Sequence, residues 1–233
     1  MIISKEKFLN GEVILIDKPL NWTSFQVVNK IRWMIKSTYG IKKIKVGHAG
    51  TLDPLATGLL ILCTGKMTKS IEKFMGHEKE YTGTFYIGAT TPSFDLETKI
   101  DKQFSTDHIS EEMLISTLSQ FKGEIDQFPP VFSALKKDGK RLYEFAREGT
   151  EVEIKSRKVI IKNFELTSTQ IPNIDFRVCC SKGTYIRSLA NDFGKALNSG
   201  AHLTALRRTR IGDFNVTEAI SIEEFEKLLL KET

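Results

Sequence analysis

Cysteine is scarce in this sequence, which has only Cys63, Cys179 and Cys180 and no Cys-x-x-Cys pair. An odd number without that spacing argues against a disulfide framework and is typical of a reducing compartment. Because the three thiols lie in or at the end of apolar runs, we expect them to be buried structural side chains. The protein is therefore expected to be cytoplasmic.

Metal-ligand spacing and long apolar runs are also missing. The four histidines are scattered along the chain, so we expect no metal site. No segment approaches the ~20 apolar residues of a membrane span, and the first residues lack the apolar core of a signal peptide. We expect no contact with a membrane. The 233 residues are 40% hydrophobic and 27% charged, which is typical of a globular protein with one large or two small domains.

Acidic residues are outnumbered, 29 against 34 Lys and Arg, and the formal net charge is +5. The excess is mild, so its distribution matters more than its size. Four short basic clusters stand out: Lys42 to Lys45, Lys136 to Arg141, Lys155 to Lys158 and Arg207 to Arg210. Each cluster alone is typical of a solvated surface, whereas four in one small protein make a nucleic-acid partner about as well supported as that alternative.

Hydrophobic periodicity predicts a mixture of helices and strands. A capping-box pattern at Thr23–Gln26 begins a helix whose apolar stripe is Phe25, Val28, Ile31 and Ile35. Further helices are expected from a Thr68 cap to residue 74, over 113–121, 142–148 and 186–197, and from a second capping box at Ser221. Strands are expected at 13–17, 59–64, 81–87, 152–154, 159–166, 175–180 and 203–211. Because strands and helices do not alternate strictly, the pattern predicts an α+β fold.

The most informative segment is the loop of small residues over 47–58, which contains a single carboxylate, Asp53. The residue before a proline avoids the helical region, and glycines let a ligand approach the backbone closely. The apolar run at 59–62 would anchor this loop as a buried strand. On these residues alone, a turn with a capping carboxylate is the simpler interpretation.

The whole segment Lys45–Leu60 resembles the signature of the TruB family of tRNA pseudouridine-55 synthases. Five more segments resemble motifs of that family and follow in family order: Asp17–Ser24, Lys79–Tyr81, Pro129–Lys136, Cys180–Leu189 and Leu203–Arg208. The resemblance extends over roughly residues 11–212.

The resemblance implies a fold similar to that of pseudouridine synthases: a mixed, mainly antiparallel sheet flanked by helices around a central RNA-binding cleft. It implies one catalytic domain over 1–233, with a thumb-like, RNA-clamping insertion at about 127–157 and a short C-terminal helix at about 221–231. Many family members continue into a small RNA-binding PUA domain. We expect none here.

The implied activity is isomerisation of uridine 55 in the T-loop of tRNA to pseudouridine. The base is flipped out, detached from C1′ and rejoined through C5, with neither cofactor nor metal. The implied partner is the T-arm of tRNA, with no obligatory protein partner and a monomeric enzyme. Family mechanisms include attack of the aspartate on the base and a glycal route, and the sequence does not choose between them.

The resemblance also implies roles for single residues. Asp53 corresponds to the essential aspartate, Arg187 to the arginine that pairs with it, and Tyr81 to the tyrosine that stacks on the target base. Substrate-binding positions are His48, Lys18, Lys69, Tyr185 and Leu206. RNA-binding positions are Lys136, Lys137, Lys140, Arg141, Arg157 and Lys158.

Two other functions remain open from the sequence. One is an RNA-folding protein that binds and releases tRNA without chemistry. The other is a guide-dependent enzyme that acts on ribosomal RNA. An Asp53→Asn variant separates the first from an isomerase, and activity on bare tRNA separates the second.

Overall fold

The computed structural model describes residues 4–133, 135–137, 139–150 and 152–231. Ala134 of the insertion motif and Asp138 of the adjacent basic segment lie outside the described residues. The chain forms two compact units, one from residues 1–81 and 207–233 and the other from residues 82–206.

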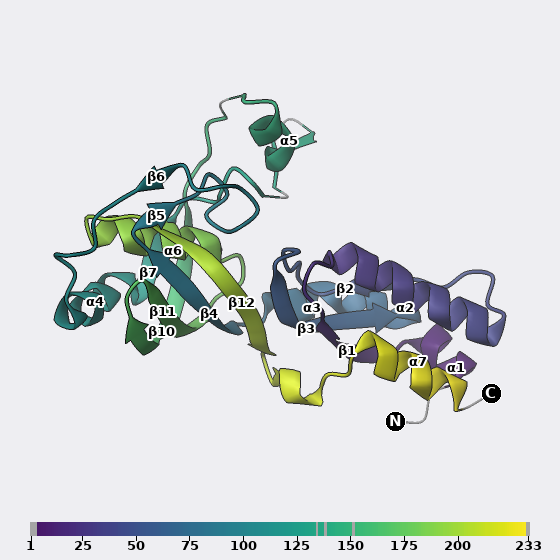
Figure 1. Cartoon of the computed structure of the whole chain (residues 1–233). Coiled ribbons are helices and arrows are strands. Elements are labelled where there is room, and N and C mark those ends of the chain that lie inside the picture. The colour runs from purple at the N-terminus through teal and green to yellow at the C-terminus, as the bar shows by residue number, and fades with distance from the viewer. Residues whose placement is uncertain (1–3, 134, 138, 151, 232–233) are drawn as a thin grey trace. The chain divides into compact units, whose positions relative to one another are not determined.

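The first unit packs helices against a small antiparallel sheet (Figure 1). Its elements are α1 (Lys5–Asn10), β1 (Val13–Lys18), α2 (Ser24–Tyr39), β2 (Val46–His48), β3 (Ala56–Thr64), η1 (Gly65–Ser70), α3 (Ile71–Gly76), β13 (Phe214–Asn215), η3 (Val216–Glu218) and α7 (Ile222–Leu230). Both β1 and β2 pair antiparallel with β3. The strand β12 (Ala201–Ile211) pairs with β3 and β13. Thus the segment before Asp53 and the segment after it belong to one sheet.

Helix α2 begins where the capping box predicts. The Thr23 hydroxyl accepts from the Gln26 amide, and the Gln26 side chain accepts from the Thr23 amide. The buried stripe contains Val28, Ile31 and Ile35 as expected. Phe25, however, is 63% exposed, so its assignment to the core was wrong. The first turn of the helix presents that position to solvent, and Val27 and Met34 complete the stripe instead.

The second unit is built on the strand order β12-β4-β11-β10-β7. Its elements are β4 (Lys79–Ile87), β5 (Ala89–Thr90), β6 (Lys102–Gln103), α4 (Glu111–Leu118), η2 (Ser119–Phe121), β7 (Gly123–Gln127), β8 (Lys136–Lys137), β9 (Lys140–Arg141), α5 (Leu142–Arg147), β10 (Arg157–Gln170), β11 (Asn173–Cys180) and α6 (Ile186–Ala196). The two strands β4 and β12 each run through the boundary between the units.

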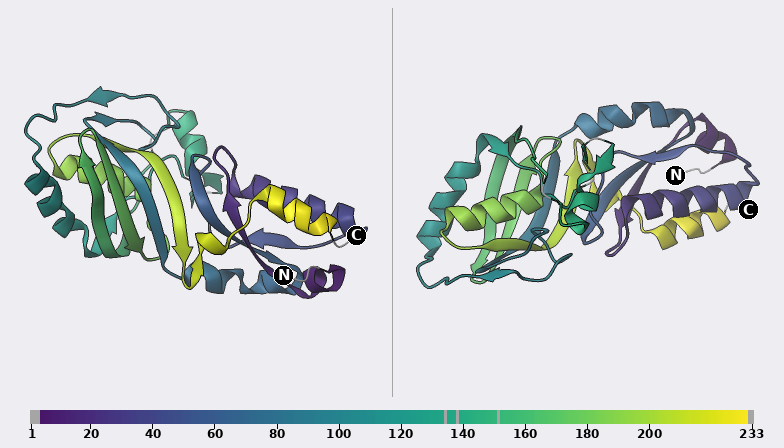
Figure 2. Two further views of the ribbon diagram at one scale, coloured as in Figure 1. Left: turned by 60° about the horizontal axis from the view of Figure 1, so that its bottom comes forward. Right: turned by 90° about the horizontal axis from the view of Figure 1, so that it is seen from above.

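Helix α6 lies along one face of these strands (Figure 2). Its Phe193 packs against Phe85 and Phe164 of the sheet and Phe121 of η2, with ring centroids 5.8 to 5.9 Å from its own, and Phe85 in turn stacks on Phe176 at 4.1 Å. The predicted α6 stripe is confirmed, since Ile186, Leu189, Phe193 and Leu197 are all buried. This aromatic core fixes the start of α6, where the Tyr185–Arg187 segment lies.

The mixed α+β class and the mainly antiparallel pairing are confirmed. Two local expectations were wrong. Residues 152–154 lie in irregular chain rather than a strand, because three alternating residues gain little without a neighbouring strand. Thr68 lies within η1 and donates to the Gly65 carbonyl, and α3 starts after Ser70. Among the described residues, no helix combines the length and the apolarity needed to cross a membrane.

Candidate functional site

The Asp53 loop between β2 and β3 is irregular, yet its backbone is held tightly. Ser24, the first residue of α2, accepts from the Leu52 amide at 2.8 Å and donates to the Leu52 carbonyl at 3.2 Å. The Asn21 amide donates to the Pro54 carbonyl at 2.8 Å. Hydrogen bonds therefore fix the peptide groups on both sides of the half-buried Asp53.

Lys18, at the end of β1, directs its ammonium at main-chain carbonyls. The residue is 0% exposed, and Nζ donates to the carbonyls of Trp22 (2.6 Å), Pro19 (2.9 Å) and Pro54 (3.4 Å). Burial lowers the pKa of Lys18 to about 8, and the charge of Asp53 opposes that shift. These are the contacts of a residue that holds the loop.

His48 ends β2 and is partly buried. Burial lowers the pKa of His48, the charge of Arg208 lowers it further, and a hydrogen bond with the Gly50 backbone opposes the shift. The lowered pKa favours the neutral form of the imidazole. Its Nδ1 is buried and has no hydrogen-bond partner among the described residues, so its capacity to form a hydrogen bond is unused there.

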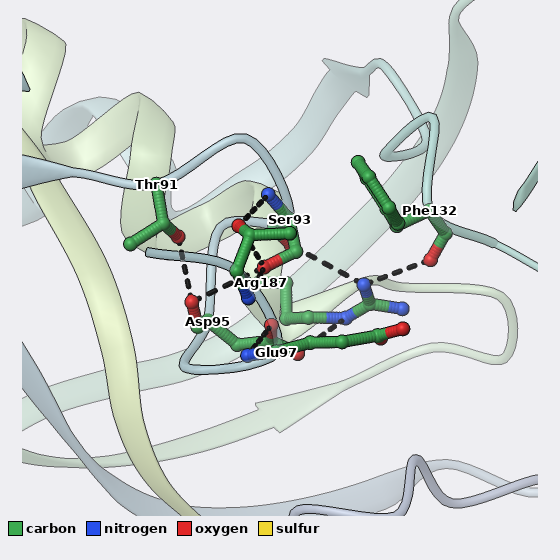
Figure 3. A network of polar contacts seen from close by, with 7 residues as sticks. Thr91, Ser93, Asp95, Glu97, Phe132 and Arg187 are labelled. Atoms are coloured by element: carbon green, nitrogen blue, oxygen red, sulfur yellow. Dashed lines mark hydrogen bonds and ion pairs between the residues drawn. The ribbon is translucent and has the colours of Figure 1, made fainter. Parts of the chain in front are cut away.

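Arg187, in the first turn of α6, is 4% exposed and surrounded by polar groups of the second unit (Figure 3). Its Nη1 donates to the carbonyls of Phe132 (2.8 Å) and Ser93 (3.2 Å). Its Nε lies 3.6 Å from Oδ2 of Asp95, which is an ion-pair distance. Because two carbonyls and a carboxylate surround it, the guanidinium has a fixed orientation.

Asp95 was missed by the sequence analysis, which named only Asp53 as the carboxylate partner of Arg187. It lies in a loop that composition marks only as polar. The loop is ordered by its own hydroxyls, because Thr91 Oγ1 and Ser93 Oγ both donate to the Asp95 carbonyl, at 2.6 and 3.1 Å. The Glu97 amide donates to Asp95 Oδ1 at 2.9 Å. No spacing rule predicts such a pair, which depends on tertiary contact alone.

Tyr185 is held by a second residue that the sequence analysis missed. The buried Gln127 side chain accepts from the Tyr185 amide at 2.8 Å and donates to its carbonyl at 3.0 Å. The Arg157 guanidinium lies over the Tyr185 ring, 4.5 Å from its centroid. Nε and Nη2 of Arg157 are buried and have no hydrogen-bond partner within the part of the chain that the structure describes. Arg157 thus belongs with Tyr185 rather than with the exposed basic residues.

The remaining predicted site residues are distributed over both units. Tyr81 is buried on β4 and Lys69 is exposed on η1, both in the first unit with Asp53, His48 and Lys18. Leu206 is partly buried on β12 in the second unit, with Arg187 and Tyr185.

The predicted RNA-binding residues fall into two groups besides Arg157. Lys136, Lys137, Lys140 and Arg141 lie on the hairpin β8–β9. Lys137 Nζ donates to the Glu153 carbonyl at 2.9 Å, and Lys140 forms an ion pair with Glu148. Lys158, on β10, forms a 2.6 Å ion pair with Glu124 of β7, and this hydrogen bond raises the pKa of Lys158.

In the described part of the chain, no cluster of three or more His, Cys, Asp or Glu side chains could hold a metal ion.

Known proteins match this chain over most of its length. A model of the TruB family pseudouridylate synthase N-terminal domain matches residues 36–186, and a model of the tRNA pseudouridylate synthase B C-terminal domain matches residues 187–233. The tRNA pseudouridine synthase B of Flavobacterium johnsoniae is 63% identical over 97% of this chain and 100% of its own length. That of Phocaeicola vulgatus is 59% identical over 95% of this chain and 94% of its own length.

A solved structure supports the same relationship. A chain in the crystal structure of a Cbf5-Nop10-Gar1 complex aligns with a TM-score of 0.72 and 29% identity. The alignment covers 97% of this chain and 56% of that one, so this chain spans little more than half the length of that relative. The resemblance read from the motifs is therefore confirmed over both family models, and the chain belongs to the TruB family of pseudouridylate synthases.

Proposed function

We propose that this protein converts the uridine at position 55 in the T-loop of tRNA to pseudouridine. The observation that carries the proposal is the full-length match to tRNA pseudouridine synthase B of Flavobacterium johnsoniae, at 63% identity. The Asp53 loop, with its backbone held on both sides, supports the proposal because a reacting carboxylate needs a fixed position.

The reaction conserves atoms and electrons. The N1–C1′ bond breaks, the C5–C1′ bond forms, C5 loses a proton and N1 gains one, so neither oxidant nor cofactor is consumed. In this proposal Asp53, as a carboxylate, attacks the nucleoside or assists departure of the base from C1′. In the same proposal Arg187 orients that carboxylate, and Tyr81 stacks on the base and accepts the C5 proton.

The other site residues recognise the flipped nucleotide in this proposal. A neutral His48 stacks and hydrogen-bonds where the extruded base leaves a gap, and its lowered pKa supports that role. Tyr185 and Leu206 line the base pocket, and the exposed Lys69 contacts phosphate. Lys18 acts indirectly, since its ammonium is engaged by the backbone near Asp53.

We further propose that residues 127–157 act as an insertion that clamps the T-arm within a single catalytic domain. Its β8–β9 hairpin carries four basic residues, which suits a phosphate backbone. Flipping the base costs a few kcal/mol, which contacts of this kind help to offset. In this proposal the enzyme is a cytoplasmic monomer that needs no metal, cofactor or protein partner.

The test is incubation of the purified protein with an unmodified tRNA transcript, followed by mapping of the modified nucleotide. We expect pseudouridine at position 55 and nowhere else. Asp53→Asn should abolish product and leave RNA affinity within about twofold, while Asp213→Asn, on an exposed turn, should behave as wild type.

Other outcomes select other functions. Full biological function of Asp53→Asn without any product would indicate an RNA-folding protein. Activity that appears only after a guide RNA is added would indicate a guide-dependent enzyme. Product at another nucleotide would contradict the assignment to the T-loop.

A further inference from the structure

The backbone over residues 50–54 is held by side chains from three separate elements of the first unit. Ser24 of α2 bonds both polar groups of Leu52, and Lys18 of β1 donates to the Pro54 carbonyl. The third element is β12, which reaches the start of the loop. An irregular segment fixed in this way keeps one conformation before substrate arrives.

The side chain that β12 contributes is Arg208, which is 1% exposed. Its Nε donates to the Leu59 carbonyl on β3 at 2.8 Å, and its Nη2 donates to the Gly50 carbonyl at 3.1 Å. Its Nη1 lies 3.5 Å from the Thr51 carbonyl. One planar guanidinium thereby joins the loop before Asp53 to the strand after it.

Close contact between β3 and β12 brings the guanidinium to this place. A Cβ on Gly58 would lie 2.3 Å from the Arg208 carbonyl oxygen, and Gly58 has a φ of 103°. Only glycine accepts both that approach and that backbone conformation without strain. Gly58 therefore lets the backbone at Arg208 come close enough to β3 for the guanidinium to reach the Gly50 and Thr51 carbonyls.

Burying a guanidinium costs desolvation free energy, which an apolar side chain of similar volume would avoid. Within the described residues, the hydrogen bonds of Arg208 all go to main-chain carbonyls. What the guanidinium adds is a rigid fork of donors, which requires its acceptors to keep their relative positions. Its charge also reaches neighbouring groups, since it lowers the pKa of His48 and of Lys18 in addition to the effect of burial.

We propose that Arg208 is a positioning residue for Asp53, which it serves by locking the Gly50 and Thr51 carbonyls to β3. The inference rests on the proposed function, because it takes Asp53 as the reacting carboxylate. Arg208 lies beneath the loop backbone and need not touch the RNA. Its loss should therefore change the rate of the chemical step and leave RNA affinity unchanged.

The experiment compares Arg208→Lys with Arg210→Lys, a matched control on the same strand. Arg210 pairs with Glu78 at 3.3 Å and donates to the Gly212 carbonyl. Both changes keep the charge and remove the planar fork. We expect Arg208→Lys to lower the single-turnover rate on unmodified tRNA by roughly 10- to 100-fold, because a misplacement of about 1 Å costs that much. The dissociation constant for RNA should stay within about twofold, and Arg210→Lys should match wild type.

Folding is controlled by taking the rates at a temperature at which circular dichroism shows every protein fully folded. Arg208→Gln, which keeps one donor group, provides a second variant if the lysine variant does not fold. A wild-type rate in either folded Arg208 variant would overturn the inference. A loss confined to RNA affinity would also overturn it, because that result would make Arg208 a binding residue.

Asp53→Asn separates this inference from the proposed function. An inactive Asp53→Asn together with a fully active Arg208→Lys refutes the positioning role alone. An active Asp53→Asn refutes the proposed chemistry, and with it the inference. Slow Arg208 variants beside an inactive Asp53→Asn and a normal Arg210→Lys are the result that we expect.

Discussion

Lys18 carries an ionisable group at a position with no exposed surface. Three carbonyls satisfy its ammonium, but they do not restore the solvation of the charge, so burial dominates its pKa. The sequence showed this lysine only as part of a family motif. Its contacts show that its main physical effect falls on the loop of Asp53, through the carbonyl of Pro54.

The lowered pKa of Lys18 predicts an unusual titration. In the folded protein Lys18 should titrate near pH 8, while in the unfolded chain it titrates near 10.5. Between these values the unfolded chain binds more protons, so this site makes the free energy of unfolding rise with pH. Relative to Lys18→Met, wild type should gain about 2 kcal/mol between about pH 8 and 10. Side-chain NMR of labelled lysines and urea unfolding measure the two effects, and a titration above pH 10 would contradict both.

The Arg187–Asp95 pair predicts a cost for removing one charge. Asp95→Asn keeps the acceptor for the Glu97 amide but removes an ionic partner of a buried guanidinium. We expect a loss of about 1–3 kcal/mol in the free energy of unfolding, measured in urea. Asp101→Asn serves as the control, because the exposed Asp101 carboxylate accepts a hydrogen bond from the Thr90 hydroxyl and pairs with no buried cation among the described residues. Equal stability of the two variants would show that the pair contributes nothing to the fold.

At the scale of elements, close strand packing restricts β4. A Cβ on Gly83 would lie 2.3 Å from the Ala205 carbonyl oxygen on β12 and 2.8 Å from the Phe176 ring. Gly83→Ala should therefore cost about 2 kcal/mol or more, because either backbone or the aromatic core must shift. Gly76→Ala, at the end of α3, meets no atom within 4 Å and should be neutral or stabilising by up to about 1 kcal/mol. Thermal unfolding of both variants checks the contrast, and equal melting temperatures would contradict it.

Elements with local signals could be predicted from the sequence. The capping boxes at Thr23 and Ser221 begin α2 and α7 as expected, because cap and partner lie within one turn. The buried run of β3 and the stripe of α6 were also predictable from periodicity. The short α1 and the two-residue strands were not, because a few residues carry no readable period.

The residues of the candidate site also divide into those that a sequence motif identifies and those that no local pattern identifies. Asp53, His48 and Arg187 could be named because family motifs contain them. Apart from local bonds, the supporting residues Asp95, Gln127 and Arg208 act through contacts to residues at least 58 and at most 158 positions away in the sequence. Such contacts depend on how strands pair, which one sequence does not encode in any local pattern.

At the scale of the whole molecule, a positive net charge of +5 predicts salt-sensitive RNA binding. If the β8–β9 hairpin contacts phosphates, Lys137→Glu and Arg141→Glu should each weaken RNA binding and lower the salt slope by about 0.7–0.9. The measurement is the dissociation constant for tRNA across a series of salt concentrations. Lys227→Glu, on the exposed side of α7, changes the charge equally and should leave the slope unaltered. Identical salt slopes in all three variants would show that the hairpin is not part of the RNA-binding surface.

The chain passes between its two units inside single strands, and β12 crosses between Leu206 and Arg207. Successive side chains on a strand point to opposite faces. One extra residue at that crossing would exchange the directions of Arg207, which pairs with Asp17, and Arg208, which lies beneath the loop. Two extra residues would restore the directions but advance both side chains by about 7 Å. Insertions and deletions at this crossing point are therefore expected to be eliminated during evolution.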